Sequence, residues 1–210
     1  MVVETPHLRA DAQRNLERIL EAACEVFARD GLDASVADVA ERAGVGTATI
    51  FRRFPTKDDL VAAVLENELE AFAGRARDAA ESDDPGVAVE RFMTSMIQSF
   101  IEDRCFCEAS GSELFQRPRM QELVGELTGS LDLLLRRAQD AGAIRSDVVA
   151  ADLGFLVSAV GQAGLRLEAS APGAWRRYAE LVFAGLRPEG AQPLTHEPPT
   201  PQQLHEAKTR

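Results

Sequence analysis

Hydrophobic residues recur at three- and four-residue spacing along most of the chain, a period typical of one face of an α-helix. The first such stripe lies within residues 15–29 and consists of Leu16, Ile19, Leu20, Ala23 and Phe27. The same spacing predicts helices over about 36–43, 47–54, 57–72, 85–100, 118–141, 150–168 and 173–186, with 104–115 ambiguous. Val, Ile and Thr are not gathered into alternating runs, so no strands are predicted. The pattern indicates an all-α protein of about nine helices.

Short polar signals mark where the N-terminal helices begin and end. Ser35 and Thr56 each stand three residues before an aspartate, Asp38 and Asp59, which is the pattern of a capping box. Gly44 is placed to end a helix in the left-handed conformation. These signals predict a helix of only about two turns after residue 35, and another short helix directly after it.

Residues 35–54 therefore predict two short helices joined by a tight turn, the helix-turn-helix plan. Ala40 is small where the helices cross, Gly44 permits the turn, and Val45 and Ile50 are apolar enough to pack beneath. The second helix is left with hydroxyl and guanidinium groups that suit base edges and phosphates in a major groove. These groups belong to Thr47, Thr49, Arg52 and Arg53.

The spacing of this segment fits a plain αα-hairpin inside a helical bundle equally well. The flanking charges favour DNA. Arg9, Arg14 and Arg18 precede the hairpin, and Lys57 opens the next helix, where free amides and the helix dipole attract phosphate.

Residues from about Asp11 to Glu70 resemble the DNA-binding domain of TetR-family transcriptional regulators. The resemblance rests on Val36–Val45 for the turn, Thr49–Phe54 for the recognition helix, and Lys57 in the segment that follows. It implies a ligand-responsive DNA-binding regulator, most often a repressor. We assign its DNA contacts to Arg14, Ser35, Thr47, Ala48, Thr49, Phe51, Arg52, Arg53 and Lys57.

Several residues depart from the family pattern. Gly46 stands where a capping serine is common, so we expect Thr47 to cap the recognition helix. Ala48 replaces a frequent glycine. Phe51 replaces a frequent tyrosine, which removes a hydroxyl expected to touch phosphate. Arg53 stands where histidine is common and adds a fixed charge.

The resemblance also implies a domain organisation. Residues 1–11 are predicted as a flexible basic arm, and residues 12–71 as the three-helix DNA-binding domain, with its helix-turn-helix at about 35–54. Residues 72–187 are predicted as a helical ligand-binding and dimerisation domain. Residues 188–210, which contain five of the ten prolines, are predicted as a disordered tail.

The resemblance implies that part of the larger domain encloses a ligand cavity, and methionine and phenylalanine suit a flexible apolar pocket. The candidate lining is Phe92, Met96, Phe100, Phe106, Phe115, Leu123, Leu127, Leu131 and Phe155. The alternative for each of these residues is ordinary core packing.

Several glycines inside one predicted helix, 150–168, indicate close contact between helices, because glycine is otherwise costly there. The resemblance implies that the last two helices build a homodimer. The predicted interface is Gly154, Val157, Gly161, Gly164, Trp175, Tyr178 and Leu181. The alternative is packing within one chain.

Charge distribution and histidine placement bear on two classes of function, DNA binding and catalysis. The net charge is −11, but residues 1–57 carry 8 Lys and Arg against 9 Asp and Glu, so the acidic excess lies in the C-terminal part. The N-terminal unit can therefore carry a basic face. The three histidines lie in the predicted tails, which argues against a histidine-based active site. We predict no enzyme activity, no metal and no cofactor. The alternatives are an all-helical enzyme and a helical protein-binding adaptor.

The remaining features bear on location and partners. Three cysteines are too few for a disulfide framework, no signal peptide is evident, and no stretch approaches the ~18 apolar residues of a membrane span. We expect a cytoplasmic protein with no membrane partner, whose partners are a pseudo-palindromic DNA operator, a small effector and a second copy of itself. Cys105 and Cys107 as a redox pair, and Gly44-Val45-Gly46 as a dinucleotide-binding start, are weaker alternatives.

Overall fold

The computed structural model describes residues 6–110, 112–200 and 203 of the 210-residue chain. The described residues form nine α-helices and two 3-10 turns, so the predicted all-α fold is confirmed. The helices are α1 (Pro6–Asp30), α2 (Val36–Ala43), α3 (Thr47–Arg53), α4 (Lys57–Ala80), α5 (Pro85–Glu102), α6 (Arg104–Ala109), α7 (Pro118–Asp140), α8 (Ala150–Leu167) and α9 (Trp175–Leu186). The 3-10 turns are η1 (Gly31–Asp33) and η2 (Glu113–Gln116).

The capping residues act as the sequence predicts. The Asp38 amide donates to the Ser35 hydroxyl at 3.2 Å, and the Asp38 carboxylate accepts from the Ser35 amide at 2.9 Å. Thr56 and Asp59 make the same pair of bonds at the start of α4, both at 3.1 Å. Gly44 ends α2 with φ +67°, a conformation that glycine adopts without strain. Local polar groups therefore fix the boundaries of the short helices.

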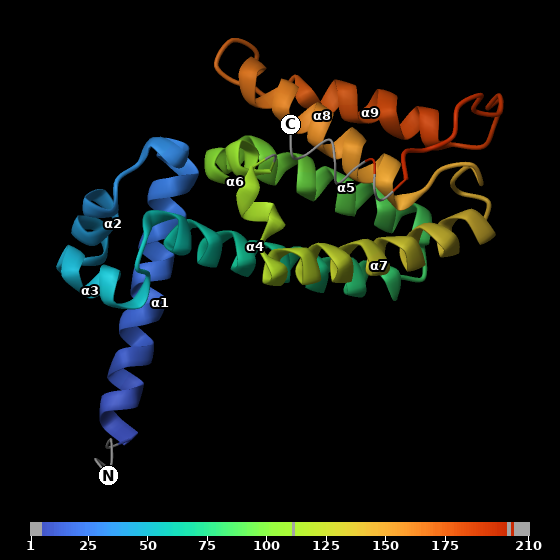
Figure 1. Cartoon of the computed structure of the whole chain (residues 1–210). Helices are drawn as coiled ribbons and strands as arrows, with labels where there is room; N and C mark the ends of the chain where they lie inside the picture. The colour runs from blue at the N-terminus through green and yellow to red at the C-terminus, as the bar shows by residue number, and fades with distance from the viewer. Residues whose placement is uncertain (1–5, 111, 201–202, 204–210) are drawn as a thin grey trace.

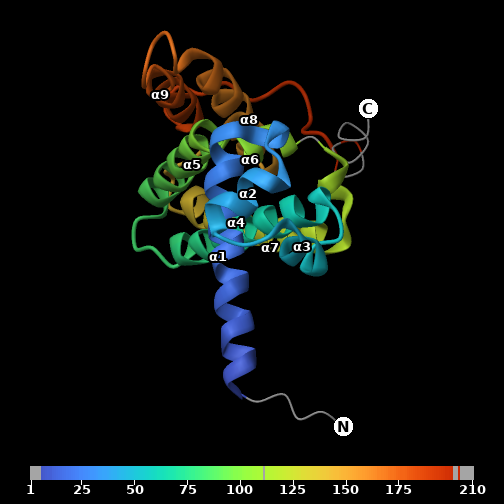
Figure 2. The same cartoon turned by 90° about the vertical axis from the view of Figure 1, so that its left-hand side faces the viewer.

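The helices form two units that share α4. Figure 1 shows the N-terminal part of α1 extending away from the C-terminal bundle, with the upper end of α1 beside α6 and with α2 and α3 on its outer side. Helix α4 runs from the end of α3 into the bundle, where α7 lies along it, and α5 packs against α8. Figure 2 shows that the N-terminal turns of α1 extend beyond the other helices.

One apolar core runs through both units because α4 contributes to each. Leu60 and Leu65 near its start are 0% exposed, as is Phe72 further along. Within the N-terminal unit, Phe27 of α1 and Ile50 of α3 are also 0% exposed. Helix α3 is thereby tied through the core to the rest of the molecule.

The N-terminal arm differs from the sequence-based expectation, and a segment that the sequence left ambiguous is now defined. Helix α1 begins at Pro6, so part of the predicted flexible arm is helical, and residues 1–5 lie outside the described residues. The ambiguous segment 104–115 divides into α6 and η2. Asp103 begins α6 by accepting from the Phe106 amide at 2.8 Å, and Ser112 begins η2.

The predicted disordered tail is partly held against the fold. Arg145 donates to the carbonyl of Gln192, and the Leu194 amide donates to the Asp147 carboxylate at 3.0 Å. Arg145 also forms an ion pair with Asp147 at 2.6 Å. Residues 188–200 therefore follow a defined path, while 201–202 and 204–210 lie outside the described residues.

Candidate nucleic-acid interface

Helix α3 has seven residues, and its packing on the hydrophobic core fixes its position. So short a helix is not stable alone, since isolated helices below ~12 residues are marginal in water. Ile50 is fully buried, and Phe54, which ends the helix, is 9% exposed. Because these two residues face inward, the other side of α3 faces solvent. Thr47, Ala48, Arg52 and Arg53 are exposed there, and Phe51 is 46% exposed.

The turn before α3 is supported from α1. The Arg18 guanidinium donates to the Ala43 carbonyl at the end of α2, where a cation also complements the helix dipole. A Cβ at Gly44 would lie 3.3 Å from Nη2 of Arg18. Arg18 therefore orients the turn.

The prediction that Thr47 caps α3 is wrong. Gly46 occupies the capping position with extended dihedrals, φ −76° and ψ 145°, and no side chain caps the helix there. Thr47 is instead the first helical residue, and its side chain is exposed.

A groove of about 390 Å³ lies between α3 and the N-terminal part of α1. Thr49, Arg52 and Arg53 line it from α3, and the Arg52 guanidinium donates to the Thr49 hydroxyl at 3.1 Å. From α1 it is lined by Gln13, Asn15, Leu16 and Ile19. The sequence analysis missed Gln13 and Asn15. The available signal was their polarity in a helix whose apolar stripe begins at Leu16.

The other predicted DNA contacts are spread over three elements. Arg14 is exposed on α1. Ser35 is exposed, but its hydroxyl donates to the Asp38 carboxylate at 2.6 Å within the capping box. Lys57 is half-buried, and its ammonium donates to the Leu32 carbonyl. Ser35 and Lys57 therefore already have structural partners, whereas α3 presents its polar groups to solvent.

The predicted pocket residues fall into two places. Eight are buried in the C-terminal domain, where the Phe106 ring lies 5.0 Å from Phe100 and 6.4 Å from Phe115, centroid to centroid. Phe72, which the sequence analysis did not name among these residues, packs against Phe106 with the ring centroids 5.3 Å apart and the planes tilted by 51°. Phe155 is separate from the others, because it is 68% exposed on α8.

Four of the seven predicted dimer residues pack within the subunit. A Cβ on Gly161 would lie 2.4 Å from Cβ of Phe100, and one on Gly164 would lie 2.6 Å from Cδ1 of Ile101. Val157 and Trp175 are also buried. The two glycines allow α8 to approach α5, so these four residues make contacts within the subunit.

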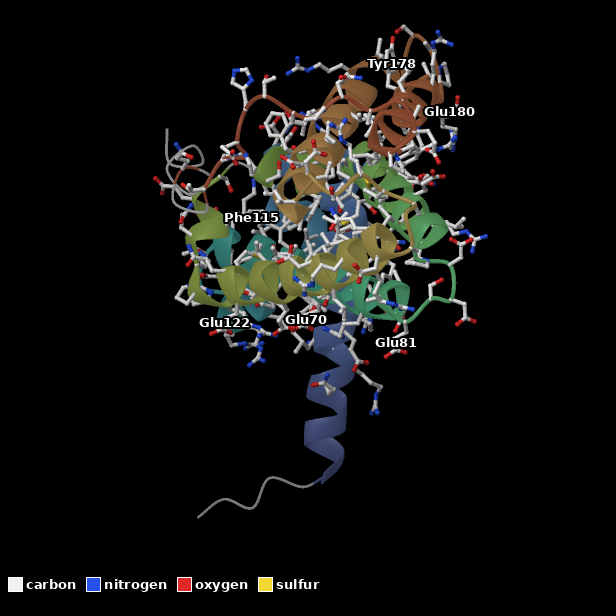
Figure 3. All side chains as sticks on the ribbon, turned by 90° about the vertical axis from the view of Figure 1, so that its right-hand side faces the viewer. Glu70, Glu81, Phe115, Glu122, Tyr178 and Glu180 are labelled. Carbon is white, nitrogen blue, oxygen red and sulfur yellow. The ribbon has the colours of Figure 1, made fainter. Side chains whose placement is uncertain are left out.

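The other three predicted dimer residues lie on an outer face of α8 and α9. Gly154 is exposed, Tyr178 is 48% exposed and Leu181 is 59% exposed. Figure 3 shows Tyr178 on the outer side of α9. An open groove of about 470 Å³ adjoins this face, and Phe155, Leu181 and Leu194 are among its lining residues.

The cysteines lie where a thiolate is disfavoured. Burial raises the pKa of Cys105 to about 12 and that of Cys24 to about 11, and nearby Glu68 and Asp103 act in the same direction. Burial also raises the pKa of the Cys107 thiol. Glu68 is itself perturbed: desolvation and a hydrogen bond with Asp103 raise its pKa to about 8.

The alternative of a dinucleotide-binding start at Gly44-Val45-Gly46 does not fit the structure. Gly44 and Gly46 follow a helix, whereas a dinucleotide fingerprint follows a strand. Across the described ranges no three His, Cys, Asp or Glu side chains are grouped to hold a metal ion. In the same residues no helix combines the length and apolar character needed to cross a bilayer.

Comparison with known proteins assigns both units. Residues 19–64 match the model for bacterial regulatory proteins of the tetR family, and residues 84–188 match the model for the C-terminal domain of SbtR-like transcriptional regulators. A TetR transcription regulatory protein from Mycobacterium vanbaalenii is 31% identical, with 86% of this chain and 99% of that chain covered and a TM-score of 0.60. A TetR regulator from Streptomyces coelicolor is 29% identical, with 82% and 98% covered and a TM-score of 0.61.

Curated relatives match over the N-terminal unit. The HTH-type transcriptional regulator LuxR of Vibrio harveyi is 38% identical over 73 residues, which cover 34% of this chain. The match spans only 36% of the length of LuxR. The likeness to LuxR therefore concerns the helix-turn-helix unit.

Proposed function

Because the chain belongs to the TetR family of bacterial regulatory proteins, we propose that it is a dimeric repressor released from its operator by a small, largely apolar effector. Members of this family are DNA-binding transcriptional regulators and not enzymes. The observation that carries the proposal is the solvent-facing polar side of α3 opposite fully buried Ile50. As a regulator of transcription, it would act in the cytoplasm.

The DNA-binding roles follow from side-chain chemistry. We assign Thr47, Thr49, Arg52 and Arg53 to the major groove, where guanidinium and hydroxyl groups pair with base edges. Arg14, and Lys57 through its remaining N–H bonds, would hold phosphates and set the register of the helix. Two copies of α3 would lie about one DNA turn apart, near ~34–36 Å, on a pseudo-palindrome.

The dimer is proposed on the outer face of α8 and α9. Phe155 and Leu181 are large apolar side chains that are more than half exposed, which is costly unless another surface covers them. Tyr178 adds an aromatic group of the kind enriched at interfaces. This face is continuous with the 470 Å³ groove, so a second copy could fill that groove.

The effector is proposed to bind among the buried apolar residues of the C-terminal domain. Phe106 packs against Phe100 and Phe115, and Met96 is buried in the same domain; such polarisable side chains adapt to an apolar guest. The guest would favour a subunit arrangement in which the two α3 helices no longer fit the operator. Such a shift requires the guest to bind the two arrangements with different affinities.

Fluorescence anisotropy on the DNA upstream of the chain's own gene tests this proposal. We expect tight binding that weakens steeply with salt despite the charge of −11, because phosphate contacts release counterions. Arg52→Ala should weaken binding, whereas Arg136→Ala, an exposed arginine on α7, serves as the matched control. Binding with no salt dependence, or equal effects of the two variants, would contradict the proposed interface.

Sedimentation tests the dimer separately. Leu181→Glu should shift the chain to monomer at micromolar concentration, because it places a charge in an apolar contact. Leu133→Glu is the control, since Leu133 is 48% exposed on α7. A wild-type chain that is monomeric, or a dimer insensitive to Leu181→Glu, would exclude this face as the interface.

A further inference from the structure

Charged side chains from two other elements hold the turn η1, which joins α1 to α2. The Leu32 amide donates to Oε2 of Glu108 at 2.8 Å, and the Leu32 carbonyl accepts from the Lys57 ammonium. Glu108 belongs to α6 in the C-terminal domain, whereas Lys57 opens α4. Both backbone groups of Leu32, the amide and the carbonyl, are therefore hydrogen-bonded to side chains of other elements.

The approach of Glu108 depends on Gly31. Its φ is +68°, and a Cβ there would lie only 2.4 Å from Oε2 of Glu108. Arg104, one turn earlier on α6, donates to Oε1 of Glu108 at 2.5 Å and lies 3.6 Å from the Asp33 carboxylate. Helix α6 thus reaches the backbone of η1 and the side chain beside it.

The hydrogen bond to Leu32 is the part of this cluster that can fix geometry. The Arg104–Asp33 pair contributes little because solvent screens it, and the Glu108–Leu32 hydrogen bond is solvent-exposed as well, so its role is directional. A carboxylate that accepts from a backbone amide forms a shorter and directional charge-assisted bond. The amide belongs to the main chain directly before α2, so it moves with the helix-turn-helix.

Helix α4 is the continuous connection between the units, and α1 also packs on α4 and α6 through the shared apolar core. Apolar packing is not directional, whereas a hydrogen bond to the backbone fixes the position of the turn. The contact of Glu108 with η1 lies at the other end of the helix-turn-helix segment. Figure 1 shows α6 beside the upper end of α1, whereas α4 begins below, next to α3.

We propose that Glu108 is a positioning residue for DNA recognition, which fixes the α2–α3 unit relative to the C-terminal domain by holding Leu32. The inference rests on the proposed function, because orientation matters when two linked α3 helices must match two half-sites.

Affinity for two DNA lengths tests the positioning role in the full chain. One duplex carries both half-sites, mapped by footprinting upstream of the chain's own gene, and the other carries a single half-site. Glu108→Ala should weaken binding to the full operator about three- to tenfold, the size of one ordinary hydrogen bond. It should change half-site binding less than about twofold, because α3 itself is intact.

Two further variants separate positioning from general damage. Glu108→Gln keeps an oxygen that accepts from Leu32 and should restore most of the operator affinity. Glu113→Ala, an exposed glutamate in η2, should leave both affinities unchanged. Equal losses on both duplexes, or a glutamine variant as weak as the alanine variant, would overturn the proposal.

A second measurement needs no DNA. Gly31→Ala should cost more unfolding free energy in the wild-type background than in Glu108→Ala, because the added Cβ displaces the carboxylate only when it is present. The Leu32 amide should also exchange faster in Glu108→Ala. If the losses of unfolding free energy from Gly31→Ala and Glu108→Ala are additive, and the Leu32 amide exchanges at the wild-type rate, the contact does not hold the turn. If Gly31→Ala and Glu108→Ala are coupled in unfolding free energy but the chain binds none of the DNA upstream of its gene, the contact exists and the proposed function is wrong.

Discussion

The Arg52 guanidinium donates through Nη2 to the Thr49 hydroxyl, one turn earlier on the same face of α3, at 3.1 Å. Both residues line the groove that α3 shares with Gln13 and Asn15 of α1. The bond restricts a long side chain before DNA arrives, so less conformational entropy is lost on binding.

Removing the Thr49 hydroxyl should therefore weaken DNA binding. Thr49→Val keeps the branched shape and should lower operator affinity about three- to tenfold, as expected for one hydrogen bond worth ~0.5–1.5 kcal/mol. Thr49→Ser keeps the hydroxyl and should stay close to wild type. Anisotropy titrations compare the variants, and equal affinities for valine and serine would contradict the role of this bond.

Arg53 is expected to read a base. Arg53→Ala should weaken operator binding by about 1–3 kcal/mol and relax preference at one operator position. Arg53→Lys should recover little, because lysine lacks the planar fork that pairs with guanine. Selection from randomised operators measures the preference, with Arg136→Ala as control. An unchanged preference in Arg53→Ala would leave this arginine only a phosphate contact.

Local chemistry explains why the helix-turn-helix could be predicted from the sequence. Ser35, Asp38 and Gly44 act within a few residues of each other, so their spacing already determines where α2 begins and ends. The position of Ile50 relative to Arg52 likewise determines which side of α3 faces solvent. Such short-range signals do not depend on the rest of the fold.

Contacts between distant segments could not be predicted in this way. Sequence alone does not tell which face of α8 meets α5, so Gly161 and Gly154 looked equivalent although only Gly161 is buried. Lys57 was assigned to phosphate, but it also meets Leu32, 25 residues earlier. The path of residues 188–200 depends on Asp147, which lies 47 residues before Leu194.

Replacing Gly161 in α8 and Gly129 in α7 by alanine should have opposite effects on the stability of the chain. Gly161→Ala should destabilise the chain by about 1–3 kcal/mol, because its Cβ meets the buried side chain of Phe100. Gly129→Ala in α7 has nothing within 4 Å of the new Cβ and should stabilise the helix by about 0.5–1 kcal/mol. Urea unfolding at one fixed protein concentration measures both. A neutral Gly161→Ala would contradict close packing of α8 on α5.

The thiols should be poor redox sensors. Burial and the neighbouring carboxylates raise the pKa values of Cys24 and Cys105, so little reactive thiolate exists near neutral pH. Diamide treatment should leave operator affinity unchanged, and iodoacetamide should label Cys105 rapidly only after unfolding. A loss of DNA binding that dithiothreitol reverses would restore the redox interpretation of Cys105 and Cys107.

Glu68 should make stability depend on pH across neutrality. It lies half-buried on α4, next to Asp103 at the start of α6, with Arg75 and the thiols of Cys24 and Cys105 as its other ionisable neighbours. Its pKa rises from the ordinary 4.5 to about 8 because desolvation and Asp103 disfavour a second negative charge. In this range the folded chain holds a proton that the unfolded chain releases. The stabilisation is therefore complete below about pH 4.5 and is lost as pH rises through 8.

Glu68→Gln provides the test of that pH dependence, because the amide resembles the protonated carboxyl at every pH. Urea unfolding between pH 5 and 9 should show the wild-type chain losing stability as pH rises, whereas Glu68→Gln should show a flatter profile and exceed wild type most at the alkaline end. Glu81→Gln, an exposed glutamate next to the end of the same helix (Figure 3), is the matched control and should parallel wild type. Four aspartates, Asp30, Asp38, Asp59 and Asp147, have pKa values lowered by hydrogen bonds; they stay ionised across this range and do not contribute to the slope. Parallel profiles for wild type and Glu68→Gln would show that Glu68 is ionised in the folded chain at neutral pH, and that the contact with Asp103 is not held by a shared proton.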